Sequence, residues 1–126
     1  MSANILVVDD TPANLQLLAY LLESGGYTVL GAETGEAAVA LAHEWNPDLV
    51  VLDIQLPDID GYEALERLRS DPALADTPVI AVTAFAMDND RRRTEEAGFD
   101  GYVTKPIDPY TFVTDIASCL ATHRRR

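Results

Sequence analysis

The chain has 126 residues, of which 48% are hydrophobic, and it carries a formal net charge of -12 at pH 7. This composition predicts one folded domain, residues 1–126, with a substantial apolar core. The acidic balance argues against direct binding to nucleic acid or to anionic membranes, because both would repel the chain. A single cysteine, Cys119, rules out an internal disulfide and favours a reducing cytoplasm, and no apolar run is long enough to span a membrane.

Taken in chain order, the apolar runs predict five strands that alternate with five helices. The strands are expected at residues 4–8, 27–32, 49–52, 79–82 and 101–104. The helices are expected from residue 12 to about residue 24, at 35–45, 61–70 and 86–97, and from residue 108 or 109 onward. Thr11 is expected to cap the first helix, with Pro12 in its first turn.

Strict alternation of strands and helices predicts an α/β fold, with a parallel sheet covered by helices on both faces. At this length we expect the flavodoxin-like strand order 2-1-3-4-5. The carboxyl ends of parallel strands lie along one edge of the sheet. The residues at those ends are Asp9 and Asp10, Asp53, Thr83 and Lys105, after strands one, three, four and five. We therefore expect these side chains to meet in one crevice.

Three clustered carboxylates repel one another unless a cation joins them. An all-oxygen ligand set without His or Cys favours Mg²⁺, with Mn²⁺ as the alternative. The simpler interpretation is that Asp9 and Asp10 cap the first helix, although one acid would suffice for that. Asp53, taken alone, could merely end its strand. A hydroxyl from Thr83 and an ammonium from Lys105, beside the cation, would hold the oxygens of a phosphoryl group.

Asp53 is the best candidate nucleophile, because it projects from the central strand between the acid pair and Thr83 with Lys105. A carboxylate beside a cation can attack phosphorus and form an aspartyl phosphate. The chain has neither a G-x-x-x-x-G-K-[ST] loop nor a G-x-G-x-x-G motif. The phosphoryl group must therefore come from another molecule.

Four stretches, in order along the chain, resemble the receiver domain of two-component response regulators. They are VVDD at residues 7–10, LDIQLPDIDGYE at 52–63, AVTAFA at 81–86 and YVTKPI at 102–107. The resemblance covers nearly the whole chain. The second and third stretches are most similar to stand-alone cell-division regulators of the DivK kind, and receivers of hybrid histidine kinases carry similar stretches.

The resemblance implies that Asp53 accepts phosphate from a histidine kinase or a histidine phosphotransferase. The implied Mg²⁺ ligands are Asp10, Asp53 and the backbone carbonyl of Gln55, with Asp9 helping through water. Thr83 and Lys105 would hold the phosphoryl oxygens, and the bond between Lys105 and Pro106 would be cis.

Further roles follow from the same resemblance. Thr83 and Tyr102 would form the switch, and Gln55 and Phe85 would tune the lifetime of the aspartyl phosphate. Tyr102 could equally be an ordinary strand aromatic. The candidates for docking the phosphate donor are Asn14, Leu15, Leu18, Pro106 and Ile107, although both leucines could belong to the core.

Two other groups of charged residues have simpler interpretations. Asp58 and Asp60 are expected to form the turn and the cap of the helix at 61–70. Arg91, Arg92 and Arg93 are expected to form a solvated helix face.

The sequence thus predicts a phosphorylation-dependent switch that signals through the face of the fourth helix, fifth strand and fifth helix. It would carry out only its own phosphorylation and dephosphorylation, and so would not be an enzyme in the ordinary sense. Met1 favours a stand-alone protein over an excised receiver of a hybrid histidine kinase acting in phosphorelay. A receiver that is never phosphorylated is a further alternative, although every residue type that phosphorylation requires is present.

Two rivals from other classes are disfavoured. A phosphatase of the haloacid dehalogenase type needs two acids spaced D-x-D, whereas Asp9 and Asp10 are adjacent. A flavin carrier on the same fold would find its cofactor repelled by this acid pair.

Overall fold

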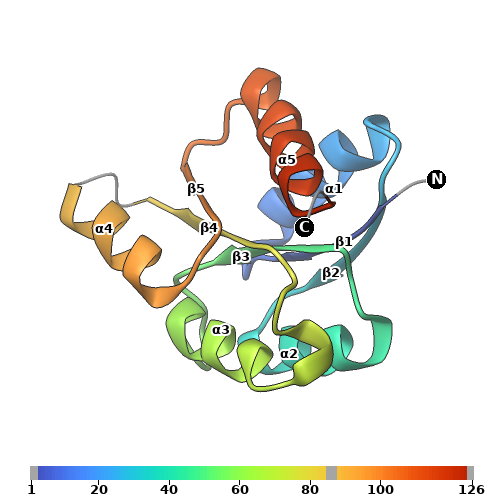
Figure 1. The fold of residues 1–126 in the computed structure, drawn as a ribbon. Helices are drawn as coiled ribbons and strands as arrows, with labels where there is room; N and C mark the ends of the chain where they lie inside the picture. Colours follow the sequence, from blue (N-terminus) through green and yellow to red (C-terminus); the bar gives the residue numbers. More distant parts are fainter. Residues whose placement is uncertain (1–2, 85–87, 125–126) are drawn as a thin grey trace.

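The computed structural model describes residues 3–84 and 88–124 (Figure 1). The strands within this part are β1 (Asn4–Val8), β2 (Thr28–Ala32), β3 (Leu49–Asp53), β4 (Val79–Thr83) and β5 (Gly101–Thr104). The helices are α1 (Pro12–Ser24), α2 (Gly35–Trp45), α3 (Gly61–Arg69), α4 (Asp88–Ala97) and α5 (Pro109–Arg124), with a short 3-10 helix at Pro72–Leu74.

The strands form one parallel sheet in the order β2-β1-β3-β4-β5, which confirms the predicted α/β fold. Helices α1 and α5 lie on one face of the sheet, and α2 and α3 on the other (Figure 1). Every residue of β3 and β4 is buried. Because alternate residues of these strands face two different cores, their sequences are apolar throughout rather than alternating. Within the described residues, no helix has the length and apolar character needed to cross a membrane.

The element boundaries differ from the prediction by only a few residues. β2 begins at Thr28, and α3 ends at Arg69. The predicted helix at 86–97 is observed as α4 from Asp88, and residues 86 and 87 lie outside the described part. Thr11 occupies the N-cap position of α1, as expected. Its side chain, however, accepts no capping hydrogen bond within the described chain.

Gly61 fixes the start of α3 against the end of β3. Its N–H donates to the carbonyl oxygen of Ile54 over 2.8 Å. A Cβ atom at Gly61 would lie 2.7 Å from the Cα of Ile54 and 2.9 Å from the carbonyl oxygen of Asp53. Only glycine permits this approach, which sets the course of the chain directly after Asp53.

Candidate functional site

The carboxyl ends of four adjacent strands bring the predicted site residues together. Asp9, Asp53 and Thr83 are almost completely buried, at 1%, 2% and 3% exposure, whereas Asp10 is exposed. One carboxylate oxygen from each of Asp9, Asp10 and Asp53 lies within 4.8 Å of the others. Parallel topology produces this cluster, because these residues follow neighbouring strands.

Lys105 provides the positive charge of the cluster. Its Nζ lies 2.8 Å from Oδ2 of Asp53 and 3.4 Å from Oδ2 of Asp9. The N–H of Lys105 donates to the carbonyl oxygen of Thr83 over 2.8 Å, which holds the residue beside the end of β4. The bond from Lys105 to Pro106 is cis, as expected from the resemblance.

Both oxygens of the Asp53 carboxylate have partners. Oδ1 accepts a hydrogen bond from the N–H of Gln55 over 3.0 Å, and Oδ2 accepts one from Lys105. Burial raises the pKa of Asp53 above its ordinary value, although the hydrogen bond from Lys105 opposes this. Burial alone would lower the pKa of Lys105, but the carboxylates of Asp53 and Asp9 raise it. The ammonium group therefore stays charged beside the carboxylates.

The donor set fits a hard divalent cation. Oδ2 of Asp9 is buried and has no hydrogen-bond partner in the described part of the chain, and the ammonium of Lys105 approaches it only to ion-pair distance, 3.4 Å. A buried carboxylate oxygen left in this way is costly unless a cation or another donor reaches it. Oδ1 of Asp9 accepts from the N–H of Thr11 over 2.9 Å, so Asp9 supports the turn into α1 and still directs one oxygen at the cluster. Three carboxylates suit Mg²⁺ or Mn²⁺.

The resemblance assigned roles to three further residues, Tyr102 in the switch and Gln55 and Phe85 in tuning the phosphate lifetime. Gln55 is exposed in the β3–α3 loop, which comprises residues 54–60. Tyr102 lies on β5, paired with Ala81 of β4, and packs half-buried against the core beneath α2 and α3. Phe85 lies outside the described residues. The roles assigned to these three side chains stay predictions.

A groove of about 460 Å³ lies between α1 and the segment after β5. Its lining residues are Asp9, Asn14, Leu17, Leu18, Lys105, Pro106 and Ile107. Of the two interpretations left open for Leu18, its burial favours the core, since the side chain is 2% exposed and belongs to an apolar cluster. Leu15 packs over Gly31 of β2 and does not line the groove. Leu17, which is 43% exposed, is the apolar side chain that the sequence analysis missed.

A second cavity, of about 480 Å³, separates the β3–α3 loop from α4. The guanidinium carbon of Arg93 lies 4.4 Å from the centre of the Tyr62 ring, and Tyr62 meets Phe99 edge to face at 5.8 Å. The arginine run was expected to be only a solvated face. All three arginines are exposed, but Arg93 also links α4 to α3 through this contact.

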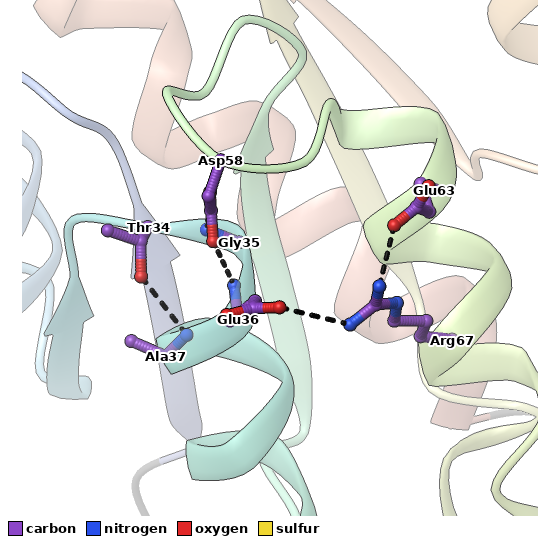
Figure 2. A network of polar contacts seen from close by, with 7 residues as sticks. All are labelled: Thr34, Gly35, Glu36, Ala37, Asp58, Glu63 and Arg67. Atoms are coloured by element: carbon purple, nitrogen blue, oxygen red, sulfur yellow. Dashed lines mark hydrogen bonds and ion pairs between the residues drawn. The ribbon is translucent and has the colours of Figure 1, made fainter.

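Asp58 and Asp60 have different roles. Asp60 caps α3 as predicted, accepting from the N–H of Glu63 over 2.9 Å. Asp58 lies in the turn before α3, as predicted. In addition, its two oxygens accept from the N–H groups of Gly35 and Glu36 at the start of α2, each over 2.8 Å (Figure 2). The hydrogen bond from Glu36 is the main cause that lowers the pKa of Asp58 to about 2. The sequence gives no local signal for this contact, since 22 residues or more separate the partners.

Sequence comparisons agree on one kind of domain. The family model described as the response regulator receiver domain matches residues 5–117. Among curated proteins, the polar-differentiation response regulator DivK of Brucella ovis is 40% identical to the chain over 120 residues. That alignment covers 95% of this chain and 98% of the DivK protein.

Solved structures give the same result. A CheY-like response regulator receiver domain protein from Methanospirillum hungatei is 30% identical, with a TM-score of 0.90, covering 99% of this chain and 98% of that chain. The receiver domain of a sensor histidine kinase from Pseudomonas aeruginosa was solved with a magnesium ion coordinated in its active site cleft. It is 30% identical, with a TM-score of 0.88, covering 96% of this chain and 99% of that chain.

Proposed function

Because the chain belongs to the family of response regulator receiver domains, we propose that Asp53 accepts a phosphoryl group from a phosphohistidine. The donor is a histidine kinase or a histidine phosphotransferase. The observation that carries this proposal is the position of Asp53, buried at the end of the central strand. Lys105 contacts the Asp53 carboxylate directly. One carboxylate oxygen from each of Asp9 and Asp10 lies within 4.8 Å of an Asp53 oxygen.

The acidic cluster holds Mg²⁺ in this proposal. Asp10, Asp53 and the main-chain carbonyl of Gln55 would be direct ligands, and Asp9 would act through a water. The receiver from Pseudomonas aeruginosa, solved with a magnesium ion in its active site cleft, supports a magnesium site in this chain. Bound Mg²⁺ supplies positive charge against the phosphoryl oxygens.

The protein's own groups carry the transfer. A carboxylate oxygen of Asp53 attacks phosphorus, and the bond from phosphorus to the donor's imidazole nitrogen breaks. The electron pair of that bond stays on the imidazole, which takes a proton from solvent. Lys105, now 2.8 Å from Asp53, turns its ammonium toward a phosphoryl oxygen, and the hydroxyl of Thr83 donates to another. Loss of the phosphate to water, within the same site, would end the signal.

The groove of about 460 Å³ is the docking site for the donor in this proposal. It borders Asp9 and Lys105, and so opens beside the cluster. Asn14, Leu17, Pro106 and Ile107 line it, giving a partly apolar surface for a helix that carries the donor histidine.

The signal leaves through the face formed by α4, β5 and α5. Thr83 ends β4 and pairs with Thr104 of β5, so a movement of Thr83 toward a phosphoryl group can reach the neighbouring strand. Tyr102 on β5 would turn inward in response. The partner of this face would be a downstream protein.

A stand-alone cytoplasmic regulator is the version that we favour. The identity with DivK, 40%, exceeds the 30% found with the histidine-kinase receiver. The alternative is a receiver of a hybrid histidine kinase that passes phosphate onward in a relay. The single cysteine agrees with a reducing compartment.

Intact mass measured after incubation with acetyl phosphate and Mg²⁺ tests this proposal. We expect one added phosphoryl group on the wild type, and none on Asp53→Asn or in the presence of excess EDTA. An unmodified wild type, also after a phosphohistidine donor is supplied, would leave only a phosphate-independent binding module.

A further inference from the structure

The β3–α3 loop is attached to its surroundings at both ends and in its middle. At its ends, the carbonyl of Ile54 accepts from Gly61, and the N–H of Gln55 donates to Asp53. In its middle, Asp58 accepts two hydrogen bonds from the first turn of α2 (Figure 2). The loop that carries Gln55 is thus attached to a helix far away in sequence.

The first turn of α2 attracts a carboxylate for two physical reasons. The first N–H groups of a helix have no partner within the helix, and the helix dipole favours negative charge there. Thr34 already caps this helix from its own side, accepting from the N–H of Ala37 over 3.1 Å. Asp58 is therefore a second, longer-range cap, and its particular effect is to join the loop to the helix.

The β3–α3 loop packs closely against the first turn of α2. A Cβ atom at Gly35 would lie 2.4 Å from Cγ1 of Ile59, so loop and helix are in direct contact beside Asp58. Nη1 of Arg67 in α3 lies 3.7 Å from Oε1 of Glu36 in α2, and its Nη2 lies 2.7 Å from Oε2 of Glu63. The pair with Glu36 adds an electrostatic contact between α2 and α3 (Figure 2). The first turn of α2, which Asp58 contacts, is therefore also in contact with α3.

We propose that Asp58 is a positioning residue for the phosphoryl-accepting site. By fastening the β3–α3 loop to α2, it holds the main chain of Gln55 and the carboxylate of Asp53 in the arrangement that binds Mg²⁺. This inference rests on the proposed function, and Asp58 is not among the residues proposed to bind the cation or the phosphoryl group.

The test compares Asp58→Ala with Thr34→Ala. Both variants remove a cap from α2, but only the first releases the loop. In the metal-free protein, NMR hydrogen exchange of the Gln55 amide should become faster in Asp58→Ala and stay unchanged in Thr34→Ala. A MgCl₂ titration should give a dissociation constant about tenfold higher in Asp58→Ala, comparable to the loss of a group that orients metal ligands. Thr34→Ala should bind Mg²⁺ as the wild type does.

Asp58→Asn keeps one acceptor oxygen. Its Gln55 exchange rate and its Mg²⁺ dissociation constant should lie between those of Asp58→Ala and the wild type. This variant replaces Asp58→Ala in the test if Asp58→Ala does not fold. Equal exchange rates of the Gln55 amide in the wild type and both Asp58 variants would contradict the proposal that Asp58 holds the β3–α3 loop in position. So would the same loss of Mg²⁺ affinity in Thr34→Ala, because α2 alone would then be responsible. Failure of the wild type to bind Mg²⁺ would instead overturn the proposed metal site, and with it the effect assigned to Asp58.

Discussion

Lys105 and the carboxylates around it set the chemistry of the site at the scale of single residues. One ammonium faces Asp9 and Asp53, and Asp10 completes the cluster, so the metal-free site has an excess of negative charge. Like charges held together destabilise the folded state, and a bound cation removes that cost. Removing one carboxylate should therefore have opposite effects with and without metal.

Asp10→Asn tests this balance. Without metal, the variant should melt roughly 2–4 °C above the wild type, because repulsion within the cluster is relieved. With MgCl₂, the melting temperature of the wild type should rise, whereas that of the variant should change little. Thermal unfolding in EDTA and in a MgCl₂ series measures both effects. A variant that gains as much as the wild type from MgCl₂ would show that Asp10 is not a ligand.

Asp58 should contribute to the pH dependence of stability. Its pKa of about 2 in the folded protein lies below the ordinary 3.8. The ionised group therefore stabilises the fold at pH values above the ordinary pKa, and the contribution is lost as pH falls toward 2. In urea titrations, the free energy of unfolding of the wild type should exceed that of Asp58→Asn by a constant margin from neutral pH to about pH 5. That margin should shrink below pH 4, and a margin independent of pH down to 3 would contradict the assignment.

At the scale of elements, close contacts between chain segments position the site. Gly61 lets α3 begin directly against β3, and Arg69 joins the end of α3 to two other loops. The guanidinium donates to the carbonyl oxygens of Leu74 and Thr77 and to Oδ2 of Asp100. These contacts connect α3 with the segment before β4 and the one before β5.

Gly61→Ala should lower the free energy of unfolding by about 1–3 kcal/mol, because the added methyl group meets main-chain atoms that cannot move aside. Gly31→Ala is the matched control. The three atoms nearest to a Cβ at Gly31 all belong to the flexible side chain of Leu15, at 3.1–3.2 Å, so the loss should be smaller. Urea unfolding of both variants measures the difference. Equal losses would show that the approach of α3 to β3 is not tight.

Arg69→Lys should lower the free energy of unfolding by about 1–2 kcal/mol, because a lysine cannot reach several acceptors at once. The ion pair with Asp100 is partly exposed, at 26% and 22%, so most of the loss should come from the carbonyl contacts. Urea unfolding at high salt separates the two contributions. A loss that disappears at high salt would assign the effect to the ion pair instead.

For the whole molecule, the sequence was sufficient to predict the sheet order and the cluster of site residues. Both follow from topology. Once strands and helices alternate, the carboxyl ends of neighbouring parallel strands must meet, and Asp9, Asp53 and Thr83 lie at those ends. The family motifs then indicated the chemistry that we propose for this cluster.

Contacts between surface side chains could not be predicted in this way. Asp58 reaches α2, and Arg93 stacks on Tyr62, across distances in sequence that no local pattern encodes. The position of Leu18 could not be decided from the sequence for a different reason. The leucines of α1 occupy more than one side of the helix, so spacing alone does not show that Leu18 is buried while Leu17 is exposed.

The central claim is that Asp53, rather than another carboxylate of the cluster, carries the phosphoryl group. Loss of labelling in Asp53→Asn does not settle this, because Asp53 is also a proposed metal ligand. The most direct measurement is to reduce the phosphorylated wild type with borohydride, which converts an aspartyl phosphate to homoserine, and to sequence the peptides by tandem mass spectrometry. We predict homoserine at position 53 alone. Homoserine at position 9 or 10 would contradict the account, since the nucleophile would then belong to the acid pair after β1.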